Sequence, residues 1–364
     1  MKIAEVIHCL EQWAPRSLQE SYDNSGLIVG DKAAEVSAVL VCLDSVEEVV
    51  DEAIEKGCNL IVAHHPIVFS GLKQFTGADY IQRTVIKAIK HDIAIYAIHT
   101  NLDHVSDGVN HMIADKIGLQ KRNILQPKKG ELKKLTVFVP VEHMEKVQEA
   151  CWQAGAGKIS TYDSCSYFTQ GSGTFRALEG ANPFVGEVNQ IHHESEARLE
   201  FVVPARVKSQ VEKALIATHP YETPAYDWVS LENRDHSVGA GMIGELEEEL
   251  PWRTFLTALK EKMNVGSIRY TKSPKEKVKR IAICGGSGSF LLNDAIGQNA
   301  DVFITGDFKY HQFFDANGKI QIADIGHFES EQFTTELIAV KLKQNFATFA
   351  VLLTEVNTNP INYL

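Results

Sequence analysis

The sequence predicts an α/β protein. A core domain, with a central sheet flanked by helices, is split in the sequence by an inserted ferredoxin-like α+β domain. Strands alternate with helices in the first third of the chain, the same alternation resumes near Gly239, and a different pattern lies between them. A length of 364 residues suits two or three domains. We expect the core over residues 1–128 and 235–364 and the insert over residues 129–234.

The composition is that of an ordinary globular protein and argues against some functions. Hydrophobic residues make up 44% of the chain, and the formal net charge is −11 with no basic block. Nucleic acid is therefore an unlikely partner, because the phosphate backbone requires clustered positive charge. No segment approaches the ~20 apolar residues of a membrane span, and the N-terminus lacks the features of a signal peptide. We expect a cytoplasmic protein whose six scattered cysteines are buried and reduced.

The first third of the chain supplies the clearest helix and strand signals. Apolar residues recur at helical spacing over residues 2–13. Ser45 precedes a periodic segment with Glu48 three residues later and a stop at Gly57, which predicts a helix that opens with a capping box. The other elements expected here are strands over residues 26–30, 37–43, 59–63 and 93–98 and a helix over residues 80–91.

The middle of the chain repeats one pattern twice. A polar linker is predicted at residues 126–134, and a loop rich in Gly, Ser and Thr is predicted at residues 170–186. The arrangement strand–helix–strand, then strand–helix–strand, is typical of a ferredoxin-like sandwich. The predicted strands include residues 135–141 and 197–204, and the predicted helices cover residues 142–154 and 205–217.

The last third returns to the first pattern, which indicates that it completes the core domain. Its helices are expected near residues 252–263, 289–297, 308–316 and 327–343, and its strands near residues 279–284, 301–305, 320–324 and 348–352.

Ligand-capable side chains follow three of these strands. His64 and His65 end an apolar run just before Pro66, so the backbone turns where two imidazoles stand side by side. Asp103 follows the next strand, and its two oxygens could bridge two ions. His327 and Glu331 stand at positions i and i+4 at the start of a helix, so they project from one face.

Together these five residues predict a metal site, because ligands gather beyond the carboxyl ends of strands in open α/β sheets. We place all three strand ends at the same edge of one sheet. Imidazole and carboxylate ligands suit zinc, iron, manganese or cobalt. Each residue alone has an ordinary alternative: a polar pair, a turn aspartate, or a helix-start carboxylate favoured by the macrodipole.

Two neighbouring features carry weaker signals. The glycine turn at residues 284–289 could present backbone N–H groups to an anion or could be a simple tight turn. Asp307, Lys309 and His311 follow another strand. They are candidates for acid–base, substrate-binding or supporting groups, or they belong to an ordinary capped helix start. Among them we take His311 and Asp307 as candidate catalytic residues.

At these residues the chain resembles the GTP cyclohydrolase 1 type 2 homologs, also called Ngg-one-interacting-factor-three-like proteins, in their long bacterial form. The resemblance runs nearly end to end. In the core it is carried by residues 22–30, 63–66, 99–103, 304–307 and 326–331, and in the insert by residues 162–166, 173–176, 179–183 and 219–222.

The resemblance implies two divalent metal ions per chain, zinc or iron first, held by ligands of matching type: His64, His65, Asp103, His327 and Glu331. It also implies a ring-like homohexamer, with trimer contacts through an insert similar to PII and CutA proteins. Asp307 departs from the family pattern, where glutamate is expected, which shortens that carboxylate by one methylene.

Two functions follow from these residues. The first is a metal-dependent hydrolase acting on a nucleotide or related small molecule, of which GTP ring opening is one special case. In it, His311 or Asp307 would assist proton transfer. The second is a non-catalytic, hexameric metal-binding regulator or sensor whose inserted domain binds an effector or partner.

Overall fold

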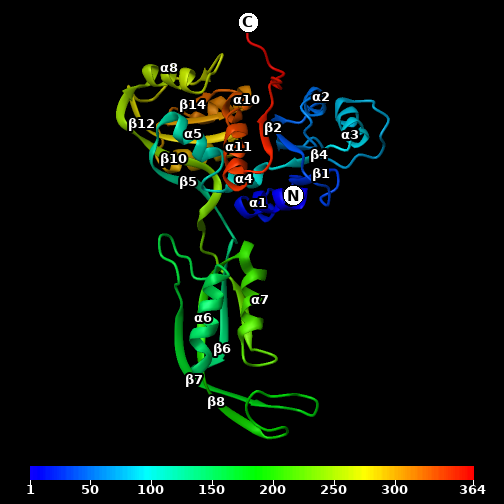
Figure 1. Ribbon diagram of the computed structural model, residues 1–364. Helices are drawn as coiled ribbons and strands as arrows, with labels where there is room; N and C mark the ends of the chain where they lie inside the picture. Colours follow the sequence, from blue (N-terminus) through cyan, green and yellow to red (C-terminus); the bar gives the residue numbers. More distant parts are fainter. The chain divides into compact units, whose positions relative to one another are not determined.

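A computed structural model describes residues 1–364, which form two compact units (Figure 1). The first unit joins Met1–Gln126 to Val238–Leu364, and the second unit is Pro127–Ser237. The predicted α/β class is confirmed. The first unit, however, contains two sheets where one central sheet was expected, of five and six strands. No helix in the chain has the length and apolar character needed to cross a membrane.

The five-stranded sheet follows the predicted pattern of buried, parallel strands. Its order is β1-β4-β3-β2-β15, and every neighbouring pair except β1 with β4 is parallel. The central strands are almost continuously apolar, as parallel strands covered on both faces are. The strands are β1 (Gly26–Val29), β2 (Ala38–Asp44), β3 (Leu60–His65), β4 (Ala94–Ala97) and β15 (Ala350–Leu353).

The six-stranded sheet has the order β11-β14-β13-β12-β10-β5. Its β12, β13 and β14 are parallel, while β10 and β11 pair antiparallel at either side. The linker predicted at residues 126–134 is wrong: β5 extends to Lys128 and β6 begins at Leu132, so only residues 129–131 lie outside the strands. β5 is polar because it is an edge strand with partly exposed side chains. The strands are β5 (Gln120–Lys128), β10 (Asp235–Pro251), β11 (Arg269–Tyr270), β12 (Lys277–Ser287), β13 (Val302–Gly306) and β14 (Gln321–Asp324).

Helices connect the strands and join the two sheets through one hydrophobic cluster. Figure 1 shows α11 beside β2 and α5, and residues of β2, α11 and β12 share this cluster. The α-helices are α1 (Ile3–Trp13), α2 (Glu47–Glu55), α3 (Tyr80–Lys90), α4 (Thr100–His104), α5 (Val109–Ile117), α8 (Trp252–Lys262), α9 (Leu292–Gly297), α10 (His327–Glu331) and α11 (Thr334–Asn345). Short 3-10 helices are η1 (Arg16–Leu18), η4 (Ser289–Leu291) and η5 (Tyr310–Ala316).

Two helix predictions need correction. The helix expected over residues 327–343 is divided into α10 and α11. The capping box at Ser45 does not form: Val46 is the N-cap of α2, and the buried Ser45 hydroxyl has no partner. Glu47 and Glu48 in the first turn favour this helix start through the macrodipole instead.

The second unit has the element order β-α-β-β-α-β and the sheet order β7-β8-β6-β9, with antiparallel neighbours. This is the order of the ferredoxin-like motif. β7 occupies part of the segment that was predicted as a loop at residues 170–186. Its sequence is polar and rich in glycine because β7 is an exposed edge strand, and this composition resembles that of a loop. The elements are β6 (Leu132–Pro140), η2 (Val141–His143), α6 (Met144–Gln153), β7 (Tyr167–Arg176), β8 (Ile191–Pro204), η3 (Ala205–Val207), α7 (Lys208–Thr218) and β9 (Tyr226–Ser230).

Candidate metal centre

The end of β3 places two histidines with different surroundings. His64 is fully buried, and its Nδ1 lies 2.8 Å from the carbonyl oxygen of Ile98. His65 is partly buried, and its Nδ1 lies 2.8 Å from Oδ1 of Asp44 at the end of β2. Since β2 and β3 are parallel and Asp44 is paired with His65 in register, this contact follows directly from the sheet.

The short helix α10, which follows β14 of the six-stranded sheet, carries His327 and Glu331. Gly326 is the N-cap of this helix and has a φ of 95°, a backbone conformation that would be strained for a residue with a side chain. Gly286 of β12 makes room for Glu331, because a Cβ at Gly286 would lie 2.4 Å from Glu331 Oε1. The glycine turn noted in the sequence therefore serves close packing next to the candidate metal ligands.

The imidazoles of β3 and α10 converge on the carboxylate of Glu331. His65 Nε2 and His327 Nε2 each lie 3.1 Å from Glu331 Oε2 and 3.3 Å from each other. His64 Nε2 lies 3.7 Å from the other oxygen, Oε1. The carboxylate of Glu331 thus lies between the nitrogen of His64 and the nitrogens of His65 and His327, the central position that the sequence suggested for Asp103. His64, His65 and Glu331 have ligand atoms within 4.8 Å of one another and could hold a metal ion.

Two buried atoms in this cluster lack partners. His64 Nε2 and Asp103 Oδ1 lie 3.8 Å apart, and neither makes a hydrogen bond. Buried polar atoms without partners are rare in native proteins, and an ion is one of the standard explanations. The residues therefore fit a metal ion at this position.

The second nitrogen of each histidine supports the same assignment. Nδ1 of His64 faces a carbonyl oxygen, and Nδ1 of His65 and His327 faces a carboxylate; the His327 partner is Asp307 Oδ2, at 2.7 Å. Each Nδ1 therefore donates its proton outward, and Nε2 is directed into the cluster. Metal-binding histidines show this arrangement, which fixes the ring and its tautomer.

Charge in the cluster shifts the pKa values of its members. Burial lowers the pKa of His65, but the carboxylates of Asp44 and Glu331 outweigh it and raise that pKa to about 9. His327 behaves likewise: burial is outweighed by Glu331 and Asp307, and its pKa rises to about 11. Burial, with the charge of Glu331, raises the pKa of Asp103. Without metal, protons therefore occupy the imidazoles of His65 and His327.

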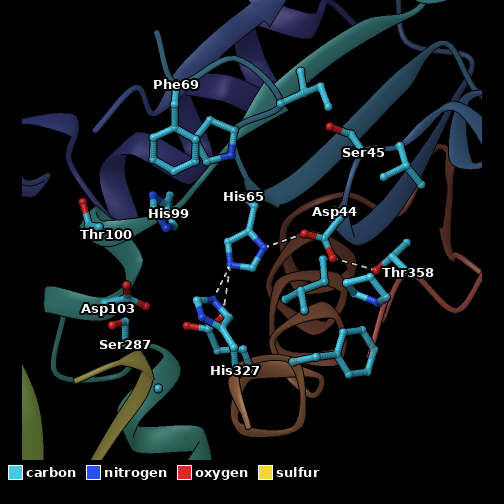
Figure 2. Close-up of a pocket in the computed structure, with 18 of the residues that line it drawn as sticks. Asp44, Ser45, His65, Phe69, His99, Thr100, Asp103, Ser287, His327 and Thr358 are labelled. Carbon is cyan, nitrogen blue, oxygen red and sulfur yellow. Dashed lines mark hydrogen bonds and ion pairs between the residues drawn. The ribbon is translucent and has the colours of Figure 1, made fainter. Parts of the chain in front are cut away.

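The cluster opens into a pocket of about 1140 Å³ in the first unit (Figure 2). The side chains around the candidate metal ligands are polar, whereas much of the remaining wall is apolar or aromatic. The aromatic residues of the wall other than histidine are Tyr22, Phe69, Tyr80, Phe290 and Phe328.

His99 is a wall residue that the sequence analysis did not select. Its Nδ1 lies 2.8 Å from Asp23 Oδ1, and its ring lies 5.4 Å from the rings of both His64 and His65. Asp23 is held by further hydrogen bonds from Ser25 and Thr100. Asp23 and His99, which we call the Asp23–His99 dyad, lie within the sequence motifs at residues 22–30 and 99–103. These motifs were the signal by which the sequence could have identified the pair.

The candidate catalytic residues lie elsewhere. His311 stacks against Phe314 in η5, and it does not line the pocket. Asp307 also lies outside the lining and contacts the outer nitrogen of His327. Asp307 thus supports the candidate ligand His327. Its φ of 59° is unusual for a residue other than glycine.

The α/β fold and the buried cluster of histidines and carboxylates define a protein with a candidate metal-binding centre. Residues 1–360 match the family described as Duf34/NIF3 (NGG1p interacting factor 3). The chain belongs to this family, which confirms the resemblance noted in the sequence.

Named relatives cover the whole chain. The GTP cyclohydrolase 1 type 2 homolog of Halalkalibacterium halodurans is 38% identical over 372 residues, covering 100% of both chains. That of Bacillus subtilis is 38% identical over 366 residues, covering 99% of this chain and 98% of the relative. A crystal structure of a Bacillus cereus protein related to NIF3 superposes with a TM-score of 0.87 at 36% identity, covering 100% of this chain and 99% of the other.

Proposed function

We propose that this protein is a metal-dependent hydrolase with two divalent ions that share the carboxylate of Glu331. The observation that carries the proposal is the position of Glu331: one oxygen faces His64, and the other faces His65 and His327. A carboxylate with nitrogen ligands on both sides is suited to bridging two ions.

The ligands divide into two groups. His64 Nε2 and Asp103 would hold one ion with Glu331 Oε1, and His65 Nε2 and His327 Nε2 would hold the other with Glu331 Oε2. Zinc or iron fits these nitrogen and oxygen donors first, then manganese or cobalt. A bound pair of ions supplies Lewis acidity, activation of water and neutralisation of developing negative charge.

His99 is the pocket residue best placed to move a proton. Because Asp23 accepts the Nδ1 hydrogen, the Nε2 atom of His99 is left as the acceptor. This nitrogen can take a proton from water and return it to a leaving group. The dyad replaces His311 and Asp307 in our assignment of the proton-transfer groups.

The pocket walls favour a small molecule with a flat or apolar body. Arg83 is the only lysine or arginine in the lining, and Glu47 lies 3.0 Å from it. A phosphate group would therefore depend on the metal end of the pocket, while Phe69, Phe290 and Phe328 offer contacts for an aromatic ring. A nucleotide or related heteroaromatic compound meets both conditions, and the name carried by the relatives points to GTP as the first compound to test.

A regulator or sensor is the second candidate, and the surface of the second unit favours it. Tyr167 and Phe168 on β7 and Ile191 on β8 are at least half exposed, which suits contacts with other chains. These exposed side chains, at the two ends of the β7–β8 pair, also support the proposed homohexamer with trimer contacts through the insert. Light scattering would measure the assembly, and metal binding without turnover of any substrate would favour this second function.

The test of the hydrolase combines elemental analysis with a substrate screen. Protein purified without added metal should contain about two ions per chain, and it should hydrolyse at least one nucleotide or related compound. Glu331→Gln should lose the ions and the activity together. The matched control is Glu336→Gln, an exposed glutamate on α11 that should leave both unchanged. Activity that persists in metal-free Glu331→Gln protein would overturn the proposal.

A further inference from the structure

The C-terminal segment, residues 356–364, has no regular secondary structure, yet it forms part of the pocket wall. Four consecutive residues, 358–361, line the pocket. Val356 packs against the hydrophobic cluster beneath the five-stranded sheet, which anchors the start of the segment. The segment is thus attached to the core just before it reaches the candidate metal centre.

Thr358 makes a specific contact in this wall. Its hydroxyl donates a hydrogen bond of 2.7 Å to Asp44 Oδ2. The other oxygen of Asp44 accepts from His65 Nδ1 at 2.8 Å, as Figure 2 shows. A continuous chain of hydrogen bonds therefore runs from the C-terminal segment to a candidate metal ligand.

The same segment reaches α10 from another direction. Asn359 Nδ2 lies 3.2 Å from Glu329 Oε1, and Glu329 stands between His327 and Glu331 on this short helix. The ligands that the segment supports, directly or through a neighbour, are thus His65 and those of α10.

The other side of the cluster is supported by different residues. His64 is oriented by the carbonyl group of Ile98, and the backbone carbonyl of Asp103 accepts from Asn110. Neither contact involves the C-terminal segment. Apart from Glu331, which both groups share, the candidate ligands of the two groups thus have separate supports.

We propose that Thr358 is a positioning residue that tightens ion binding on the His65–His327 side of the centre and leaves the His64–Asp103 side unaffected. The inference rests on the two-ion site of the proposed function. Groups that hold metal ligands in place typically change metal affinity by about 10–100-fold. Because Thr358 acts through Asp44, we expect an effect at the lower end, about tenfold.

The test measures metal affinity, not activity, by competition between the protein and a chromophoric chelator for Zn²⁺. Thr358→Val should lower the affinity for one of the two Zn²⁺ ions about tenfold. Thr358→Ser, which keeps the hydroxyl, should bind both ions with the affinity of the wild type. The matched control is Thr354→Val. It removes another hydroxyl-to-carboxylate bond of the C-terminal region, from Thr354 to Glu52, away from the candidate ligands.

Two backgrounds identify the affected side. In Asp103→Ala protein, which keeps the ligands on the His65 side, Thr358→Val should lower the affinity for the remaining ion. In His327→Ala protein it should have no effect.

The outcomes separate the inference from the proposed function. A wild-type protein that binds no Zn²⁺ would overturn both. Two tightly bound ions in the wild type, with equal losses or no loss in Thr358→Val, would overturn only the role of Thr358.

Discussion

His64 Nε2 and Asp103 Oδ1 face each other at 3.8 Å, both buried and both without a hydrogen-bond partner. Each would be stabilised by an ion between them, since unpartnered buried polar atoms cost free energy. An ion that binds only the folded protein also raises its stability, by about 2.7 kcal/mol at one hundred times the dissociation constant.

We therefore expect Zn²⁺ to raise the melting temperature of protein treated with a chelator. In Asp103→Asn protein the rise should be smaller, because one ligand group is incomplete and the bound metal falls from two ions to one. Calorimetry with elemental analysis measures both. An unchanged metal content in Asp103→Asn would remove Asp103 from the ligand set.

The metal-free protein should lose stability at alkaline pH. The pKa of His65 rises from 6.5 to about 9 on folding, so its protonated form stabilises the folded state. That contribution is complete below pH 6.5 and is lost as the pH rises through about 9. Urea unfolding at a series of pH values, with a chelator present, should show this decline.

Zinc should reverse this pH dependence. Because the ion replaces the protons on His65 and His327, binding should release protons and strengthen as the pH rises through about 9. Isothermal titration calorimetry in buffers of different ionisation enthalpy counts the released protons. A count of zero at pH 7 would show that these imidazoles are already neutral in the metal-free protein.

Gly286→Ala should displace the carboxylate of Glu331 in the candidate metal centre. The new Cβ would lie 2.4 Å from Glu331 Oε1, at a φ of 59° that strains a side chain. We expect a loss of about 1–3 kcal/mol in unfolding free energy and weaker metal binding. Gly297→Ala, at a position with open space around it, is the control and should keep both properties.

His99→Ala should separate proton transfer from metal binding. If His99 moves the proton, kcat should fall by about 10²–10⁴-fold, while the metal content stays unchanged. Asp23→Asn should lower kcat in the same direction, since the tautomer of His99 is then no longer fixed by a carboxylate. A variant that retained full activity would assign the dyad to structure alone.

The local pattern of the sequence was sufficient for most strands and helices of the first unit. Long apolar runs such as Val39–Leu43 identify buried parallel strands, and their bounds agree with the structure within a few residues. The edge strands β5 and β7 were missed because most of their side chains are at least partly exposed, so that their sequences resemble linkers or loops. The division of the core into two sheets depends on long-range pairing, which local spacing does not encode.

The candidate ligands could be selected from the sequence because imidazoles and carboxylates stand at strand ends. Their roles could not. The central position of Glu331 depends on the way the two sheets face each other, and the dyad of Asp23 and His99 joins residues 76 positions apart. His311 was chosen for its residue type and place after a strand, but the turn of η5 directs it toward Phe314.

The centre is assembled from two stretches of chain that are distant in sequence. One stretch supplies His64, His65 and Asp103, and the other supplies His327 and Glu331 after a whole second unit has intervened. Each of the two ligand groups needs residues from both stretches, because Glu331 lies in the second stretch and His64 and His65 lie in the first. Zinc would therefore act as a reporter of complete synthesis and folding: a nascent or cleaved chain that lacks its last 40 or so residues should be unable to hold the ion in its native site.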